Sequence, residues 1–209
     1  MSVILYDYWR SSAAYRVRIA LNLKGVAYEP RPVSLIKGEQ RGLQHLARNP
    51  QGLVPTLEVD GLVLTQSLAI IDWLDATYPV PRLIPADTAE RARAWARALV
   101  IVSDIHPIDN LRVLKRLESQ FGADQAARDD WYRHWIREGL EALETMAGEG
   151  PFLGGSEPDI SDLCLVPQLY NARRLELPLD CYPRLGRADA AAAELEAFAA
   201  AHPDRVKPA

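Results

Sequence analysis

Hydrophobic and polar positions divide this chain into two parts of different texture. In residues 1–78, short apolar runs alternate with amphipathic stretches, a pattern typical of an α/β unit. Runs rich in β-branched and aromatic residues predict strands at 3–8, 28–33, 55–59 and 62–65. Helical spacing of apolar residues predicts helices at 12–24, 39–47 and 67–77. Asp60-Gly61 predicts a tight hairpin turn between the last two strands.

From residue 87 the pattern is helical almost to the end of the chain. Asp87-Thr88-Ala89-Glu90 is a variant of the capping box and predicts that a long helix begins there. Further helices are predicted at about 125–147, from Asp159 onward and over 188–201. We therefore expect an all-helical domain at 87–209.

Three prolines separate the two parts. Pro79, Pro81 and Pro85 interrupt the helical pattern, because proline lacks the backbone N–H that a helix needs. We expect a linker at 79–86 after an α/β domain at 1–78.

The first candidate for chemistry is the start of the helix at 12–24. An apolar strand stops just before it, and Ser11 and Ser12 follow. The first turn of a helix has unpaired N–H groups and about half a positive charge, so it attracts anions, and a thiolate is one such anion. Two interpretations remain open: the serines only cap the helix, or a serine hydroxyl also acts on a bound thiolate.

A second constellation lies later in the α/β part. Val54-Pro55 stands where a strand begins, and a trans peptide is favoured there by frequency, while a cis peptide would turn the Val54 backbone toward a ligand. Gln66-Ser67 opens the next helix and provides a second place for an anion. Two helix starts with extended backbone between them suit a short peptide that carries a thiol and a carboxylate.

Composition narrows the function classes. A formal net charge of −4 disfavours a polyanion-binding surface, so nucleic acid is not an expected partner. No apolar stretch approaches the roughly 18 residues of a membrane span, and we expect a soluble, cytoplasmic protein that binds no membrane. Cys164 and Cys181 suit a reducing compartment. No metal is expected, because the cysteines lack ligand spacing and the histidines are scattered, at His45, His106, His134 and His202.

Several motifs together resemble the zeta class of the cytosolic glutathione transferases. The resemblance covers nearly the whole chain and rests on segments 10–21, Val54-Pro55, 66–70, 81–85 and 162–168. It implies a thioredoxin-like first domain, an all-helical second domain, a homodimer and glutathione as cofactor. The implied activity is glutathione-dependent cis–trans isomerisation of maleylacetoacetate or maleylpyruvate, a step of aromatic catabolism.

The resemblance also implies roles for individual residues. Ser11, with Ser12 beside it, would face the glutathione sulfur. The implied glutathione-binding residues are Gln40 or Lys37 at the glycyl end, Val54 with a cis Pro55, and Gln66 and Ser67 at the γ-glutamyl carboxylate. The implied residues for a dicarboxylate substrate are Arg10, His106, Asn110, Arg112 and Arg174.

Other residues restrict the roles and activities that this resemblance implies. Asp159 and Asp162 match a helix-capping box of the family, so we assign them to stability. Ala13 stands where the class commonly has cysteine, which argues against reductive dehalogenation, and Cys164 is expected in the core. Two alternatives are a conjugating transferase with broad electrophile use, including haloacids, and a non-catalytic glutathione- or protein-binding member.

Overall fold

The computed structural model describes residues 2–208, and by their contacts these residues form two compact units. The first unit contains the described residues up to Leu83 together with those from Ala193 onward, and the second is Ile84–Ala192. The first unit holds the strands and the second is helical, as the sequence pattern predicted.

The first unit is built on a four-stranded sheet in the order β2-β1-β3-β4. Its strands are β1 (Val3–Asp7), β2 (Glu29–Pro32), β3 (Thr56–Val59) and β4 (Leu62–Thr65). β2 runs parallel to β1, whereas β3 is antiparallel to both β1 and β4. The predicted hairpin is confirmed, because Asp60 and Gly61 both have positive φ angles, of 46° and 88°.

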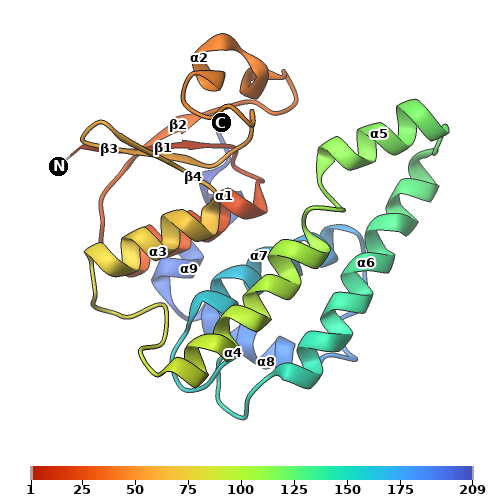
Figure 1. Ribbon diagram of the computed structural model, residues 1–209. Coiled ribbons are helices and arrows are strands. Elements are labelled where there is room, and N and C mark those ends of the chain that lie inside the picture. The colour runs from red at the N-terminus through yellow and green to blue at the C-terminus, as the bar shows by residue number, and fades with distance from the viewer. Residues whose placement is uncertain (1, 209) are drawn as a thin grey trace. The chain divides into compact units, whose positions relative to one another are not determined.

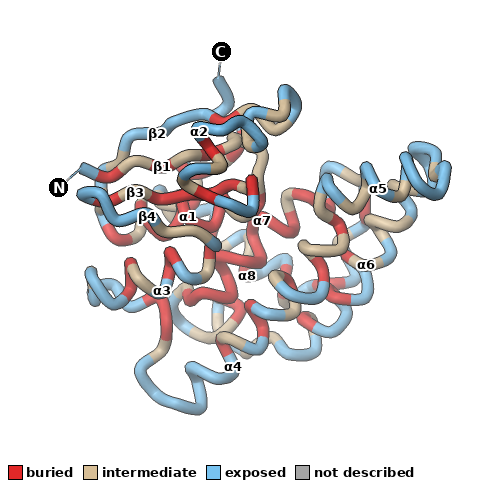
Figure 2. Tube along the Cα trace, turned by 45° about the horizontal axis from the view of Figure 1, so that its top comes forward, coloured by how far each residue is buried: buried red, intermediate tan, exposed pale blue. Residues whose placement is uncertain are grey.

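Helices α1 (Ser12–Leu23) and α3 (Ser67–Thr77) pack together on one face of this sheet (Figure 1). Figure 2 shows β1 and β3 as its most buried strands, with Leu5 and Leu57 fully buried. The predicted helix at 39–47 is present as two short pieces, η1 (Glu39–Arg41) and α2 (Leu43–Leu46), on the exposed side of the unit. Both helix starts singled out in the sequence therefore belong to one unit.

A buried ion pair ties the end of α3 to the segment that follows it. Lys24 Nζ lies 2.7 Å from Asp75 Oδ1 and also donates to Tyr78 O at 2.6 Å. Asp75 Oδ1 accepts a further hydrogen bond from Leu83 N at 2.7 Å. Because these groups are buried, they need such partners to offset the loss of hydration.

The end of the chain differs from the expected boundary at 87–209. Helices α9 (Glu196–Ala201) and α10 (Pro203–Val206) belong to the first unit. Arg18 Nε donates to Ala201 O at 3.0 Å, and Asn22 Nδ2 donates to Ala197 O at 2.9 Å. These bonds to α1 explain why helix propensity over 188–201 does not give one continuous helix: the chain breaks after Ala193 and turns back onto α1.

The second unit is a set of packed helices with α7 (Ile160–Arg174) most deeply buried (Figure 2). Its other elements are α4 (Thr88–Leu99), the π-helical η2 (Val100–Ile105), α5 (Leu111–Phe121), α6 (Gln125–Met146) and α8 (Pro183–Ala193). The starts of α4, α6 and α7 agree with the sequence predictions, whereas η2 and α5 were not predicted. No residue of α5 is buried, so it lacks the apolar burial that marks a packed helix.

Candidate functional site

Ser11 is the N-cap of α1. Its backbone is extended, with φ −70° and ψ 120°, and its Oγ accepts a hydrogen bond from Ala14 N at 3.3 Å. Ser11 therefore caps α1, and this bond leaves its hydroxyl proton to be donated to a ligand.

The two serines differ in accessibility. Ser11 is half-buried, whereas Ser12 is the first residue inside the helix and is only 5% exposed. Of the pair, Ser11 is the hydroxyl that a ligand can approach. Just before it, the half-buried Arg10 lies with its Cζ 5.5 Å from the centre of the Trp9 ring.

The Val54–Pro55 peptide bond is cis, as the family resemblance implied. Neither the N–H nor the C=O of Val54 makes a hydrogen bond within residues 2–208. The preceding carbonyl is held firmly, because Leu53 O accepts from both His45 Nε2 at 2.7 Å and Asn49 Nδ2 at 2.9 Å. Val54 thus offers one donor and one acceptor of an extended chain from a fixed backbone.

Gln66 forms the N-cap of α3 with a positive φ of 69°. A glutamine rarely adopts this left-handed conformation, and such backbone strain concentrates at binding sites. Ser67 begins the helix and is buried, and its Oγ accepts from Arg16 Nη1 at 3.4 Å. The start of α3 therefore combines unpaired first-turn N–H groups with two polar side chains.

Gln40, the residue expected at the glycyl end, lies in η1. Its Oε1 is buried and has no hydrogen-bond partner among the described residues. An amide oxygen in this state is a natural place for a ligand donor. The alternative residue, Lys37, is exposed in the preceding loop.

Three of the residues expected to bind substrate lie at the junction of η2 and α5. His106 follows η2, with its N–H bonded to Ile101 O at 2.8 Å. Asn110 caps α5, and its Oδ1 accepts from Arg112 N at 3.2 Å. Arg112 is exposed in the first turn of that helix.

Arg174 lies elsewhere, in the last turn of α7. It is exposed, and its Nη1 donates to Asn171 Oδ1 at 3.1 Å rather than to a group of the junction. His106, Asn110 and Arg112 therefore lie in the segment that joins η2 to α5, whereas Arg174 lies on α7.

Asp109 is a titratable group at this junction that the sequence did not single out. It is 3% exposed, and neither carboxyl oxygen has a hydrogen-bond partner within residues 2–208. Burial alone raises the pKa of Asp109 to about 8, because the charged form loses its hydration. A loop aspartate next to a capping asparagine carries no sequence signal of burial, since loop aspartates are usually exposed.

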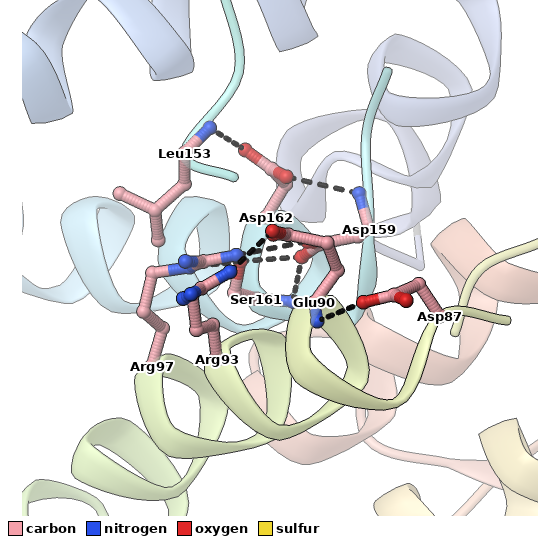
Figure 3. Close-up of polar contacts among 8 residues, drawn as sticks. All are labelled: Asp87, Glu90, Arg93, Arg97, Leu153, Asp159, Ser161 and Asp162. Atoms are coloured by element: carbon pink, nitrogen blue, oxygen red, sulfur yellow. Dashed lines mark hydrogen bonds and ion pairs between the residues drawn. The ribbon is translucent and has the colours of Figure 1, made fainter. Parts of the chain in front are cut away.

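The start of α7 is occupied by the protein's own groups (Figure 3). Asp159 Oδ1 accepts from Ser161 N at 2.7 Å, while Asp162 Oδ2 accepts from Asp159 N at 3.0 Å, which completes a capping box. Asp162 Oδ1 also accepts from Leu153 N at 2.7 Å, and Arg97 Nη2 lies 3.2 Å from Asp159 Oδ2. The expected structural role of Asp159 and Asp162 is confirmed.

Burial, with a smaller contribution from neighbouring Asp159, raises the pKa of Asp162 to about 7. Cys164, two residues further along α7, is fully buried, as expected for a core residue, and Cys181 is exposed.

No helix between residues 2 and 208 is long and apolar enough to cross a membrane. Over the same range, no group of three or more His, Cys, Asp or Glu side chains is gathered as a metal site would require.

Family models match both parts of the chain. The model "Glutathione S-transferase, N-terminal domain" matches residues 1–76, and "Glutathione S-transferase, C-terminal domain" matches residues 124–203. The chain is 50% identical to maleylacetoacetate isomerase from Rhizobium meliloti (strain 1021), covering 98% of both proteins. It is 46% identical to maleylpyruvate isomerase from a Ralstonia species, over 95% of this chain and 96% of the relative.

Solved structures agree with this result. A maleyl pyruvate isomerase described as a bacterial zeta-class glutathione S-transferase matches with a TM-score of 0.96 and 44% identity, covering 99% of both chains. Maleylacetoacetate isomerase from Anaeromyxobacter dehalogenans 2CP-1, with glutathione bound in its active site, matches with a TM-score of 0.89 and 47% identity. That match covers 100% of this chain and 98% of the other. The expected architecture, an α/β unit followed by a helical unit, is confirmed.

Proposed function

Because this chain belongs to the glutathione S-transferase family, we propose that it is a glutathione-dependent cis–trans isomerase that acts on maleylacetoacetate or maleylpyruvate. The observation that carries the proposal is the match to isomerases of this kind at 46–50% identity over nearly the whole chain. The finer assignments to the zeta class, a homodimer and the cytoplasm belong to the same proposal.

The residues of the first unit fit glutathione. Val54 offers the free N–H and C=O that an extended peptide needs, and Gln40 has a buried amide oxygen without a partner. Gln66 and Ser67 stand at a helix start, where a carboxylate is favoured. These features match a short peptide with polar groups at both ends.

Ser11 is the residue that we assign to the thiol. Its Oγ already accepts from Ala14 N, so its hydroxyl hydrogen is available to a bound sulfur. A free thiol has a pKa near 8.5, and a hydroxyl donor together with the positive end of α1 lowers that value. At neutral pH a larger fraction of the thiol is then ionised and nucleophilic.

When bound, glutathione supplies a thiolate that adds to the activated cis double bond and leaves again after rotation, so that the trans double bond forms and no glutathione is consumed. Ser11 holds the sulfur as an anion before addition and receives it back as an anion after elimination.

The second unit provides the cations and polar groups for the acid substrate. Both candidate substrates carry two carboxylates, and the planar guanidinium of arginine binds a carboxylate through two parallel hydrogen bonds. We assign this role to Arg174 and Arg112, with Asn110 and His106 as hydrogen-bonding neighbours. Arg10 is the further candidate from the first unit.

The test is an isomerase assay on both acids with and without glutathione. We expect turnover that depends on glutathione in catalytic amounts and leaves its concentration unchanged. Isomerisation at full rate without glutathione, or steady consumption of glutathione into conjugates, would contradict the proposal. The second outcome would favour a conjugating transferase that acts on haloacids or other electrophiles.

A further inference from the structure

The peptide unit that joins Leu53 to Val54 is held through its carbonyl by two side chains. Leu53 O accepts from His45 Nε2 at 2.7 Å and from Asn49 Nδ2 at 2.9 Å. Both residues are buried, His45 at 5% and Asn49 at 2% exposure. A carbonyl oxygen can only accept, so Nε2 is a protonated nitrogen of the His45 ring.

These two bonds also set the direction of the Val54 N–H. A peptide unit is planar, and in the trans form its C=O and N–H point in opposite directions. The bond between Leu53 and Val54 is trans. The Val54 N–H therefore points away from His45 and Asn49, and it makes no hydrogen bond within residues 2–208. The Val54 C=O belongs to the next peptide unit, so these two bonds do not orient it.

His45 is fixed by its backbone and by ring packing. Its N–H donates to Gly42 O at 3.0 Å, and its ring meets the Tyr6 ring edge-on with the centroids 6.5 Å apart. The other ring nitrogen, Nδ1, is buried and has no hydrogen-bond partner among the described residues. An unpaired buried polar atom costs free energy, so packing alone does not account for an imidazole at this position. What the imidazole adds over a hydrocarbon ring is the donor at Nε2.

We propose that His45 is a positioning residue that directs the Val54 N–H at a carbonyl of the bound peptide. It acts through Leu53 O, and the bond to this oxygen also polarises the shared peptide unit, which makes its N–H a stronger donor. A donor fixed before binding avoids the cost of ordering it during binding. Because Gln40 and Ser67 are assigned to the two ends of glutathione, Val54 takes the middle, cysteinyl residue, so this inference rests on the proposed function.

Three ligands separate the two backbone groups of Val54 in calorimetric Kd measurements. Glutathione offers both a C=O and an N–H at its cysteinyl residue. In an alkene analogue, a trans carbon–carbon double bond replaces the cysteinyl–glycine amide and removes the carbonyl that the Val54 N–H would contact. In an ester analogue, an oxygen replaces the cysteinyl N–H and leaves that carbonyl in place.

Two variants test the donor at His45. His45→Phe keeps an aromatic ring against Tyr6 but removes the donor, while Leu53 O keeps its bond from Asn49 and is not left unpaired. His45→Gln provides an amide N–H at a similar reach. The control variant is His134→Phe, at a half-exposed histidine of α6 in the second unit.

We expect His45→Phe to weaken glutathione and the ester analogue by the same factor, about threefold to tenfold, as for loss of one hydrogen bond. The alkene analogue should bind His45→Phe and the unaltered protein equally, because it has no carbonyl for the Val54 N–H. His45→Gln should recover most of the lost affinity. His134→Phe should change none of the Kd values.

Several results would overturn the inference. Equal weakening of all three ligands by His45→Phe would make His45 a residue that only shapes the loop, and no weakening would give it no role. Failure of His45→Gln to recover affinity, or a matching loss in His134→Phe, would also contradict it. If the unaltered protein does not bind glutathione, the proposed function itself fails, so the two failures are distinguishable.

Discussion

The start of α7 and the starts of α1 and α3 use the same hydrogen-bonding groups for different purposes. At α7 these groups stabilise the fold, whereas at α1 and α3 we propose that they bind a ligand. At α7, Asp159 and Asp162 accept hydrogen bonds from Ser161, Leu153 and their own backbone, and Asp162 is fully buried. At α1, the half-buried Ser11 accepts one bond and keeps its hydroxyl proton.

At α3, Gln66 and Ser67 each make a hydrogen bond to one other residue, Gln51 and Arg16 respectively. The difference teaches that a capping residue alone does not reveal function. A helix start is structural where the protein supplies all partners, and it can hold a ligand where reachable donors or acceptors remain.

The start of α5 fits neither the structural nor the ligand-binding kind of helix start. It gives the largest expected effect on stability. Asp109, just before the cap Asn110, is buried without partners, and its pKa is raised from 3.8 to about 8. Below about pH 4 the folded and unfolded states are both protonated, whereas at higher pH only the folded state keeps the proton. This group therefore makes the free energy of unfolding fall as pH rises from about 4 to about 8, by at most about 6 kcal/mol in total.

Asp109→Asn keeps the shape and removes this titration. We expect the variant to gain stability relative to the unaltered protein as pH rises from 4 to 8, measured by urea unfolding at several pH values. A stability difference that stays constant over this range would show that Asp109 is ionised in the folded state.

Removing the capping box of α7 should have the next largest effect on stability. Asp162→Ala leaves the buried N–H groups of Leu153 and Asp159 without acceptors, and each orphaned group costs about 1–3 kcal/mol. We expect a loss of roughly 3 kcal/mol in the free energy of unfolding, measured in urea. Asp87→Ala, at the exposed start of α4, is the matched control and should cost only about 1 kcal/mol. Equal losses would refute the distinction between buried and exposed caps.

A smaller effect is expected on catalysis from Arg174→Ala. Loss of a charge-assisted pair costs about 1.5–3 kcal/mol, which corresponds to roughly a tenfold to hundredfold fall in kcat/KM for the dicarboxylate. Glutathione affinity should not change, because the two ligands are assigned to different units. The neighbouring Arg173, which pairs with Asp189, provides the control variant Arg173→Ala. An equal loss of glutathione binding in Arg174→Ala would mean that the residue is misassigned.

The smallest expected effect is that of thiol alkylation. Cys164 is buried, Cys181 is exposed, and Ala13 provides no thiol beside Ser11. Isomerase activity should survive alkylation of the free enzyme, and reductive dehalogenation of chlorinated hydroquinones should be negligible. Sustained dehalogenation that depends on either cysteine would contradict this assignment.

Local patterns predicted what depends on local physics. Strand alternation, the hairpin at Asp60-Gly61 and the starts of α4 and α7 follow from neighbours in sequence and were found as predicted. The motif at Ser11 also predicted a cap. Of the two serines only Ser11 is the cap, because Ser12 lies inside the helix.

Contacts between residues far apart in the sequence could not be predicted from the pattern of hydrophobic and polar positions. The return of α9 onto α1 depends on Arg18 and Asn22, whose partners lie far along the chain. The burial of Asp109 and the bond between Gln51 and Gln66 likewise arise only when separate segments meet. Even the cis peptide at Pro55 was left open by local reasoning and was implied only by family resemblance.

The most direct test of the central claim is an ultraviolet titration of the thiol of glutathione bound to the unaltered protein and to Ser11→Ala. If the start of α1 holds a thiolate, the thiol pKa should lie below its free value near 8.5 in the unaltered protein and should rise in the variant, with lower isomerase turnover. Loss of the cap should also cost about 1 kcal/mol of stability, so binding is measured where both proteins are folded. An identical thiol pKa in both proteins would leave Ser11 as a structural cap and contradict the account.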